Sequence, residues 1–210
     1  NKNLLEKFYR RIRSHVMLCR LVLLTVDVGN LVAAKQAGVL QSVSSDILNK
    51  NIPFQFRDDD GYWYGLSARS RVIYYAPDRL DTARISTYES LAAPDLGYRV
   101  CVRSSFNIYN QSLMASMIAH HGEEKALDWA AGLVNNFGRN PQDNDTGQIR
   151  AVASGECDAA QNNEYPVNPD VAVSGIVRDL GNFKADNLNL SDIEKHSARA
   201  IRLMDKAGWR

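Results

Sequence analysis

The sequence lacks the features by which several classes of protein are recognised. No apolar run approaches the roughly 18 residues that a membrane-spanning helix needs. The net charge is only +1, so charge gives no argument for a nucleic acid or an anionic membrane as partner. The chain has no G-x-S-x-G or H-E-x-x-H motif and no phosphate-binding glycine loop. These absences argue against a membrane-spanning protein, a nucleic-acid-binding protein and the common classes of enzyme.

Cysteines are few and follow no recognised pattern. The chain has 3 of them, and none lies in a C-x-x-C or zinc-binding motif. Cys101 lies within an apolar run, and we expect it to be a small core residue. With 45% apolar residues in a length of 210, the chain can bury one good core or two small ones.

Apolar runs of strand length alternate with segments of helical periodicity, which is typical of an α/β protein with a parallel-rich sheet. A continuous apolar run predicts a strand covered on both faces, and helical spacing that stops at a glycine predicts the end of a helix. A capping box at Ser191 and Glu194 predicts the start of a closing helix. The expected strands are residues 21–26, 71–75 and 99–103, and the expected helices are residues 31–37, 110–121, 123–137 and 191–207.

Residues 1–20 are basic, and their apolar positions fit one stripe of a helix. One interpretation is an amphipathic helix that binds a membrane surface or an acidic partner. The other, which we favour, is a surface helix whose apolar stripe packs on the sheet.

Two positions follow expected strands at the edge where α/β proteins bind ligands. Tyr109 stands at the start of the helix after residues 99–103, where a phenol can reach into a cleft, and Asn110 is next to it. Asp27 follows residues 21–26. Its carboxylate could bond a ligand or a tyrosine that holds one, or it could cap the next helix, which is the simpler interpretation.

The segment VRSSFNIYNQSLMASMIAHHG, residues 102–122, resembles the ferric-ion-binding proteins of bacterial ABC importers, in particular the cyanobacterial type. The resemblance continues through residues 25–31, 58–75, 86–97 and 162–167, and through the C-terminal segment that begins FKADNL. It implies a type II periplasmic-binding-protein-like α/β fold, with two lobes built on parallel-rich mixed sheets. It also implies that Tyr109 is a phenolate ligand of Fe(3+).

Ferric ion is a hard cation that favours anionic oxygen, and metal binding stabilises the deprotonated form of a phenol. Arg103 belongs to the same motif and could offset phenolate charge or bind an accompanying anion. A salt bridge at the strand end is an equal alternative for Arg103. We include Arg103, Asp27 and Asn110 as candidates around the metal.

The chain departs from the family in two places. No N-terminal ligand segment matches, and the strand that leads to the family's tandem ligand tyrosines is followed at once by a segment from near the family's C-terminus. We therefore expect N-terminal and internal deletions, the second between about residues 160 and 161. The expected lobes are residues 1–75 with 161–210, including the closing helix, and residues 76–160.

The resemblance implies the substrate-binding component of an iron(III) ABC transporter and not an enzyme. Such a protein is exported to the periplasm, although this chain shows no signal peptide, and it is only peripheral to the membrane. Its partners would be ferric ion and an inner-membrane permease, with no nucleic acid. The alternative is a degenerate scaffold or interaction module that has lost most of its iron ligands and does not transport.

Overall fold

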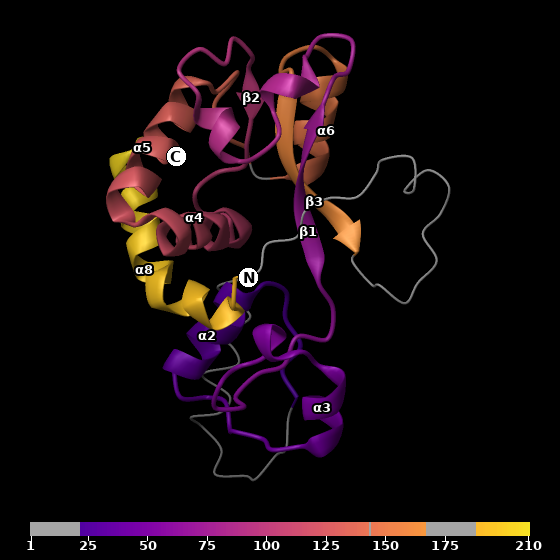
Figure 1. Ribbon diagram of the computed structural model, residues 1–210, viewed down its shortest axis with the longest axis vertical. Coiled ribbons are helices and arrows are strands. Elements are labelled where there is room, and N and C mark those ends of the chain that lie inside the picture. Colours follow the sequence, from indigo (N-terminus) through magenta and orange to yellow (C-terminus); the bar gives the residue numbers. More distant parts are fainter. Residues whose placement is uncertain (1–21, 143, 167–187) are drawn as a thin grey trace.

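The computed structural model describes residues 22–142, 144–166 and 188–210. Its centre is a three-stranded sheet in the order β1-β3-β2, formed by β1 (Arg69–Tyr75), β2 (Val100–Cys101) and β3 (Ala159–Pro166) (Figure 1). β3 is antiparallel to β1 and parallel to β2. The prediction of a mixed α/β sheet is confirmed, although its longer pairing is antiparallel.

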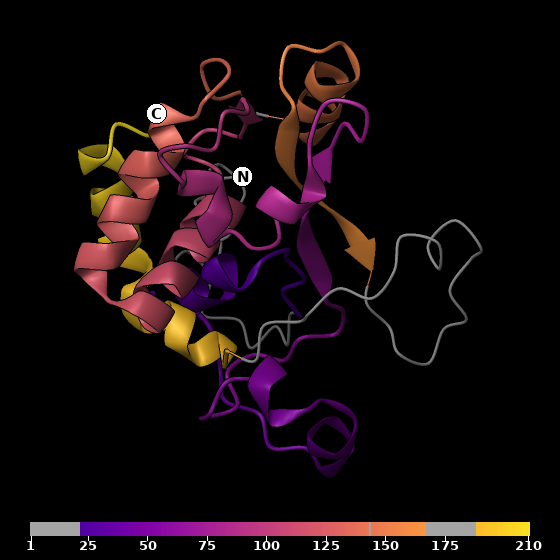
Figure 2. The same cartoon turned by 45° about the horizontal axis from the view of Figure 1, so that its top comes forward.

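Helices cover both faces of this sheet. Figures 1 and 2 show α4, α5 and α8 grouped on one side, with α6 beside β3 on the other. The α-helices are α2 (Val28–Gln36), α3 (Asp46–Asn51), α4 (Ile108–His121), α5 (Glu123–Asn135), α6 (Asp145–Ala153) and α8 (Leu190–Lys206). The short 3-10 helices are η1 (Phe54–Phe56), η2 (Thr82–Arg84) and η3 (Glu89–Ala92). No helix within the described ranges is long and apolar enough to cross a membrane.

The pleat of the short strand β2 separates two hydrophobic clusters, because successive side chains of a strand point to opposite faces. Val100 belongs to the larger cluster, beneath α4, α5 and α8, and Cys101 belongs to the smaller one, beneath α6. Buried side chains of the larger cluster include Val102, Met114, Met117, Ala130, Leu133, Met204 and Trp209. Helix α8 packs mainly on α4, and also on α2 and α5. The lobe boundaries at residues 75 and 160 stay a prediction.

Helix α4 forms where the sequence predicts it and begins two residues earlier. Asn107 caps it by accepting a hydrogen bond from the backbone N–H of Tyr109 at 3.0 Å. Gly122 ends it with a φ of 82°, a conformation that glycine adopts without steric cost. The apolar positions Met114, Met117 and Ile118 are buried, as their spacing predicts.

The prediction of a buried strand at residues 21–26 is wrong for its described part. Residues 22–26 belong to no strand, and the side chains of Val22 and Leu24 are 85% and 74% exposed. A buried parallel strand needs a neighbour on each side, and the sheet that the described residues form gives this segment none. The helix predicted after it is confirmed as α2.

Two further predictions are corrected. Helix α8 is capped by Asn189, whose side chain accepts from the backbone N–H of Ser191, so the helix begins before the predicted capping box. Cys101 is buried as predicted, but it is also joined in a disulfide to Cys157, with the two Cα atoms 5.8 Å apart. The pair is separated by 56 residues, and no spacing motif marks it. The helix predicted at residues 1–20 lies outside the described residues.

Candidate metal site

The predicted site residues gather around the N-terminal end of α4. Tyr109 lies in its first turn and is partly buried, and Asn110, next to it, is fully buried. Arg103 lies just beyond β2, in the turn that leads to α4. Asp27 is the residue that caps α2, and α2 packs on α4. Residues from three separate segments therefore meet at one helix terminus.

Arg103 makes the salt bridge that the sequence left as one alternative. Its Nη1 lies 2.8 Å from Oδ2 of Asp145, the first residue of α6, and the two side chains are only 15% and 19% exposed. The same guanidinium stands over the phenol ring of Tyr109, with Cζ 5.8 Å from the ring centroid. A cation in this position is attracted to the face of the ring.

Asn110 holds the backbone of the turn that carries Arg103. Its Nδ2 donates to the carbonyl oxygens of Arg103 and Ser104, at 2.7 and 3.1 Å. The carbonyl of Arg103 also accepts the indole N–H of Trp209 at 2.9 Å. The amide nitrogen of Asn110 is therefore committed to backbone, and a role toward a bound anion stays a prediction.

Asp27 is a cap and a link between helices. Its Oδ1 accepts from the backbone N–H of Gly29 at 2.8 Å and from the hydroxyl of Ser112 at 2.6 Å. Ser112 lies one turn after Tyr109 on α4, so the bond fixes α2 against the site helix. Burial raises the pKa of Asp27, against the lowering effect of these hydrogen bonds and of the Arg71 charge. Its φ of 67° is rare for a residue other than glycine.

Sequence reasoning missed Arg71 and Asp145. Arg71, on β1, is close enough to Asp27, Arg103 and Asp145 for their charges to affect its pKa, which burial lowers. The sequence did offer one signal for Arg71: it lies two residues before Ile73, so in a strand the two side chains lie on the same face. Asp145 is 42 residues from Arg103 in sequence, and no local pattern announces their contact.

A second tyrosine, Tyr88, bonds the backbone of Arg71. Its hydroxyl donates to the backbone carbonyl of Arg71 at 2.6 Å, and burial raises the pKa of this phenol above the ordinary value for tyrosine. Tyr88 is thus held as a neutral hydrogen-bond donor. The ring of Tyr109 has the Arg103 guanidinium over its face.

The described residues contain no group of three or more His, Cys, Asp or Glu side chains that could hold a metal. Two carboxylates are linked to this region: Asp27 bonds Ser112 of α4, and Asp145 bonds Arg103, whose guanidinium stands over the ring of Tyr109. For a hard cation, this arrangement offers the phenol oxygen of Tyr109, beside the ion pair of Arg103 and Asp145.

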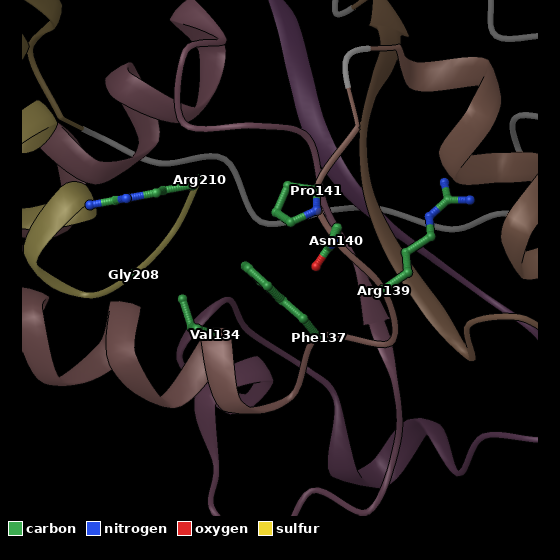
Figure 3. Close-up of a pocket in the computed structure, with 7 residues that line it drawn as sticks. All are labelled: Val134, Phe137, Arg139, Asn140, Pro141, Gly208 and Arg210. Atoms are coloured by element: carbon green, nitrogen blue, oxygen red, sulfur yellow. The ribbon is translucent and has the colours of Figure 1, made fainter.

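A surface hollow of about 580 Å³ lies elsewhere, near the end of α5 and the C-terminal residues (Figure 3). Figure 3 shows Arg139 pointing away from Phe137 and Pro141. Its guanidinium bonds Glu156, Gln148 and the carbonyl of Gly147 instead. The lining residues are Val134, Phe137, Arg139, Asn140, Pro141, Gly208 and Arg210, and they include none of the predicted site residues.

Comparisons with known proteins agree with one another. The family described as bacterial extracellular solute-binding protein matches residues 22–163. Iron uptake protein A2 of Synechocystis sp. strain PCC 6803 is 34% identical over 264 residues, which cover 90% of this chain and 76% of the relative. Iron uptake protein A1 of the same organism is 46% identical over 167 residues, which cover 77% of this chain and 46% of the relative.

Solved structures show the same kinship. Apo FutA2 from Synechocystis PCC6803 matches with a TM-score of 0.87 and 33% identity, over 98% of this chain and 90% of that one. The Trichodesmium protein IdiA (FutA), solved in complex with iron and citrate, matches with a TM-score of 0.86 and 32% identity, over 98% and 89%. These neighbours are type II periplasmic binding proteins, so the predicted fold class is confirmed. The A2 alignment spans more positions than the 210 residues of this chain, so part of that relative has no counterpart here. An internal deletion gives such a gap, and its place between about residues 160 and 161 stays a prediction.

Proposed function

Because the chain belongs to the bacterial extracellular solute-binding proteins, we propose that it is the substrate-binding component of an iron(III) ABC importer and binds ferric ion through the phenolate of Tyr109. The observation that carries the proposal is the position of Tyr109 at the N-terminal end of α4, with the Arg103 guanidinium over its ring. Two curated relatives are named as iron uptake proteins, and a third, from Serratia marcescens, as an Fe(3+)-binding periplasmic protein.

The chemistry follows from the residues present. Ferric ion replaces the phenol proton of Tyr109, so binding strengthens as pH rises. Arg103 supplies a positive charge beside the phenolate, and Asp145 balances that charge. With a single phenolate, water or a small anion completes the coordination of the ion, in a cleft between the two proposed lobes.

The buried disulfide between Cys101 and Cys157 supports the proposed compartment. Disulfides form and persist in oxidising environments such as the bacterial periplasm. The protein would there deliver ferric ion to an inner-membrane permease, and it would remain peripheral to the membrane.

A ferric titration against a weak competing chelator, followed by visible absorbance, tests the proposal. Tyrosinate bound to ferric ion gives a charge-transfer band that the free protein lacks. We expect a stoichiometric band in the wild-type protein and its loss in Tyr109→Phe. Tyr75→Phe is the matched control, because Tyr75 is an exposed tyrosine of β1, and this variant should keep the band.

A wild-type protein without the band would contradict the proposal and leave the scaffold alternative. A band that persists in Tyr109→Phe would contradict the choice of ligand.

A further inference from the structure

Residues 137–142 lie along the exit of β2. The backbone N–H of Gln142 donates to the carbonyl of Val102 at 3.3 Å, and the N–H of Ser104 donates to the carbonyl of Gln142 at 3.2 Å. Asn144 then caps α6 by accepting from the N–H of Gly147. Asp145 is therefore fixed at the start of a helix, beside the segment that carries Arg103.

The carboxylate of Asp145 and the guanidinium of Arg103 form a charge-assisted hydrogen bond of 2.8 Å in a setting where little of either side chain reaches solvent. Helix α6 packs on the face of the sheet opposite to α4, through the cluster that contains Cys101 and Val152. The position of Asp145 is thus set by a part of the core that does not include Tyr109.

This arrangement has a consequence for Tyr109. A guanidinium carries five donors on a flexible stem, and a phenolate oxygen is a strong acceptor for them. A donor that bonds this oxygen competes with a metal for it. While Asp145 engages the guanidinium, the cation lies over the ring face, 5.8 Å from the centroid.

We propose that Asp145 is a positioning residue for metal binding: it holds Arg103 over the ring of Tyr109, so that the guanidinium does not compete with ferric ion for the phenolate oxygen. The inference rests on the proposed function, because ferric ion is the ligand. The role of Asp145 in positioning Arg103 can be tested separately, in the metal-free protein.

Asp145→Asn tests the role, because it removes the charge and keeps the shape of the side chain. We expect about a tenfold loss of ferric affinity, and a charge-transfer band at shorter wavelength, because a hydrogen bond from Arg103 lowers the energy of the phenolate electrons. Asp145→Glu retains the carboxylate and should recover most of the affinity. Arg103→Gln combined with Asp145→Asn should cost no more than Arg103→Gln alone.

Glu156→Gln is the matched control. It breaks an arginine–carboxylate pair of the same 2.8 Å length, between Arg139 and Glu156, neither of which is a candidate site residue. This variant should leave the affinity and the band unchanged. An unchanged band and affinity in Asp145→Asn, or equal losses in both variants, would overturn the inference.

A second readout needs no metal. We expect the ring current of Tyr109 to shift the Arg103 Nε–H signal in spectra of arginine-selective 15N-labelled protein. Tyr109→Leu should abolish this shift and so identify the signal. We expect Asp145→Asn to abolish it too. If the shift survives, Asp145 does not position Arg103, whatever the titration gives. If the wild-type protein shows no iron band, it is the proposed function that fails.

Discussion

The carboxylate of Asp27 bonds two helices, and its backbone adopts an unfavourable conformation. It caps α2 and binds Ser112 of α4, and it does so in a left-handed backbone conformation that glycine would adopt more easily. Of its two possible roles, the structure shows the cap. A bond to a ligand stays a prediction, since the carboxylate oxygen that is used faces Gly29 and Ser112.

The raised pKa of Asp27 predicts a pH-dependent stability. Burial favours the protonated form in the folded state, so the ionised carboxylate costs stability at neutral pH, and the wild-type protein regains it as pH falls through the raised pKa. Asp27→Asn keeps an acceptor oxygen and removes the charge. We expect its unfolding free energy at pH 7 to exceed that of the wild type, and the excess to shrink as the pH is lowered. Urea unfolding at several pH values measures this; a variant less stable than wild type at pH 7 would show that the attraction to Arg71 outweighs burial.

Between elements, Asp158 joins the beginnings of β2 and β3 to the turn after β1. Its Oδ2 accepts from the backbone N–H of Arg99 at 2.9 Å, its Oδ1 lies 3.6 Å from Nε of Arg79, and its carbonyl accepts from the N–H of Ala76 at 3.0 Å. Burial would raise the pKa of Asp158, but the hydrogen bonds from Arg99 and the charges of Arg99 and Arg79 together lower it. The ionised carboxylate therefore stabilises the small sheet.

We expect Asp158→Asn to lower the unfolding free energy by about 1–3 kcal/mol at neutral pH. The folded-state pKa lies below the ordinary value of 3.8, so the contribution is present above that value and is lost as pH falls through the lowered pKa. The difference between variant and wild type should accordingly vanish in acid. Thermal or urea unfolding across this pH range is the measurement, and a difference that does not depend on pH would contradict the electrostatic account.

The elements that the sequence predicted correctly are those with local signals. Helix α4 has an apolar period, an Asn cap and a terminal glycine, all within one segment. Residues 21–26 carried an equally clear apolar run, but a strand also needs neighbours, and apolar composition does not reveal whether they exist. The pair of Arg103 and Asp145 was beyond local reasoning for the same reason, because only the tertiary fold brings α6 to the end of β2.

For the whole molecule, the disulfide is the strongest covalent constraint on a chain that is shorter than its relatives. It ties β2 to the segment just before β3, beneath α6. The strand β2 has only two residues, so few hydrogen bonds between strands hold it in the sheet. The disulfide joins this short strand to the residues before β3, and it also restricts the unfolded chain.

Cys101→Ala combined with Cys157→Ala should lower the unfolding free energy by about 4 kcal/mol, the chain-entropy value for a loop of this length. The two cysteines are 56 residues apart in sequence. Urea unfolding with and without a reductant measures the effect: reductant should destabilise the wild-type protein and leave the double variant unchanged. A wild-type protein indifferent to reductant, once its cysteines are shown to be reduced, would contradict a stabilising disulfide.

The hydrogen bond from Trp209 to the carbonyl of Arg103 gives the protein its own optical reporter. The indole is fully buried and packs edge-on against Trp129 and Phe137, so its emission belongs to a dry environment. If Tyr109 binds ferric ion as proposed, a movement of the Arg103 backbone on binding would alter the electric field at that indole. Stopped-flow fluorescence of the unlabelled protein would then follow the proposed binding of ferric ion in real time, at the residue whose guanidinium stands over the ring of Tyr109.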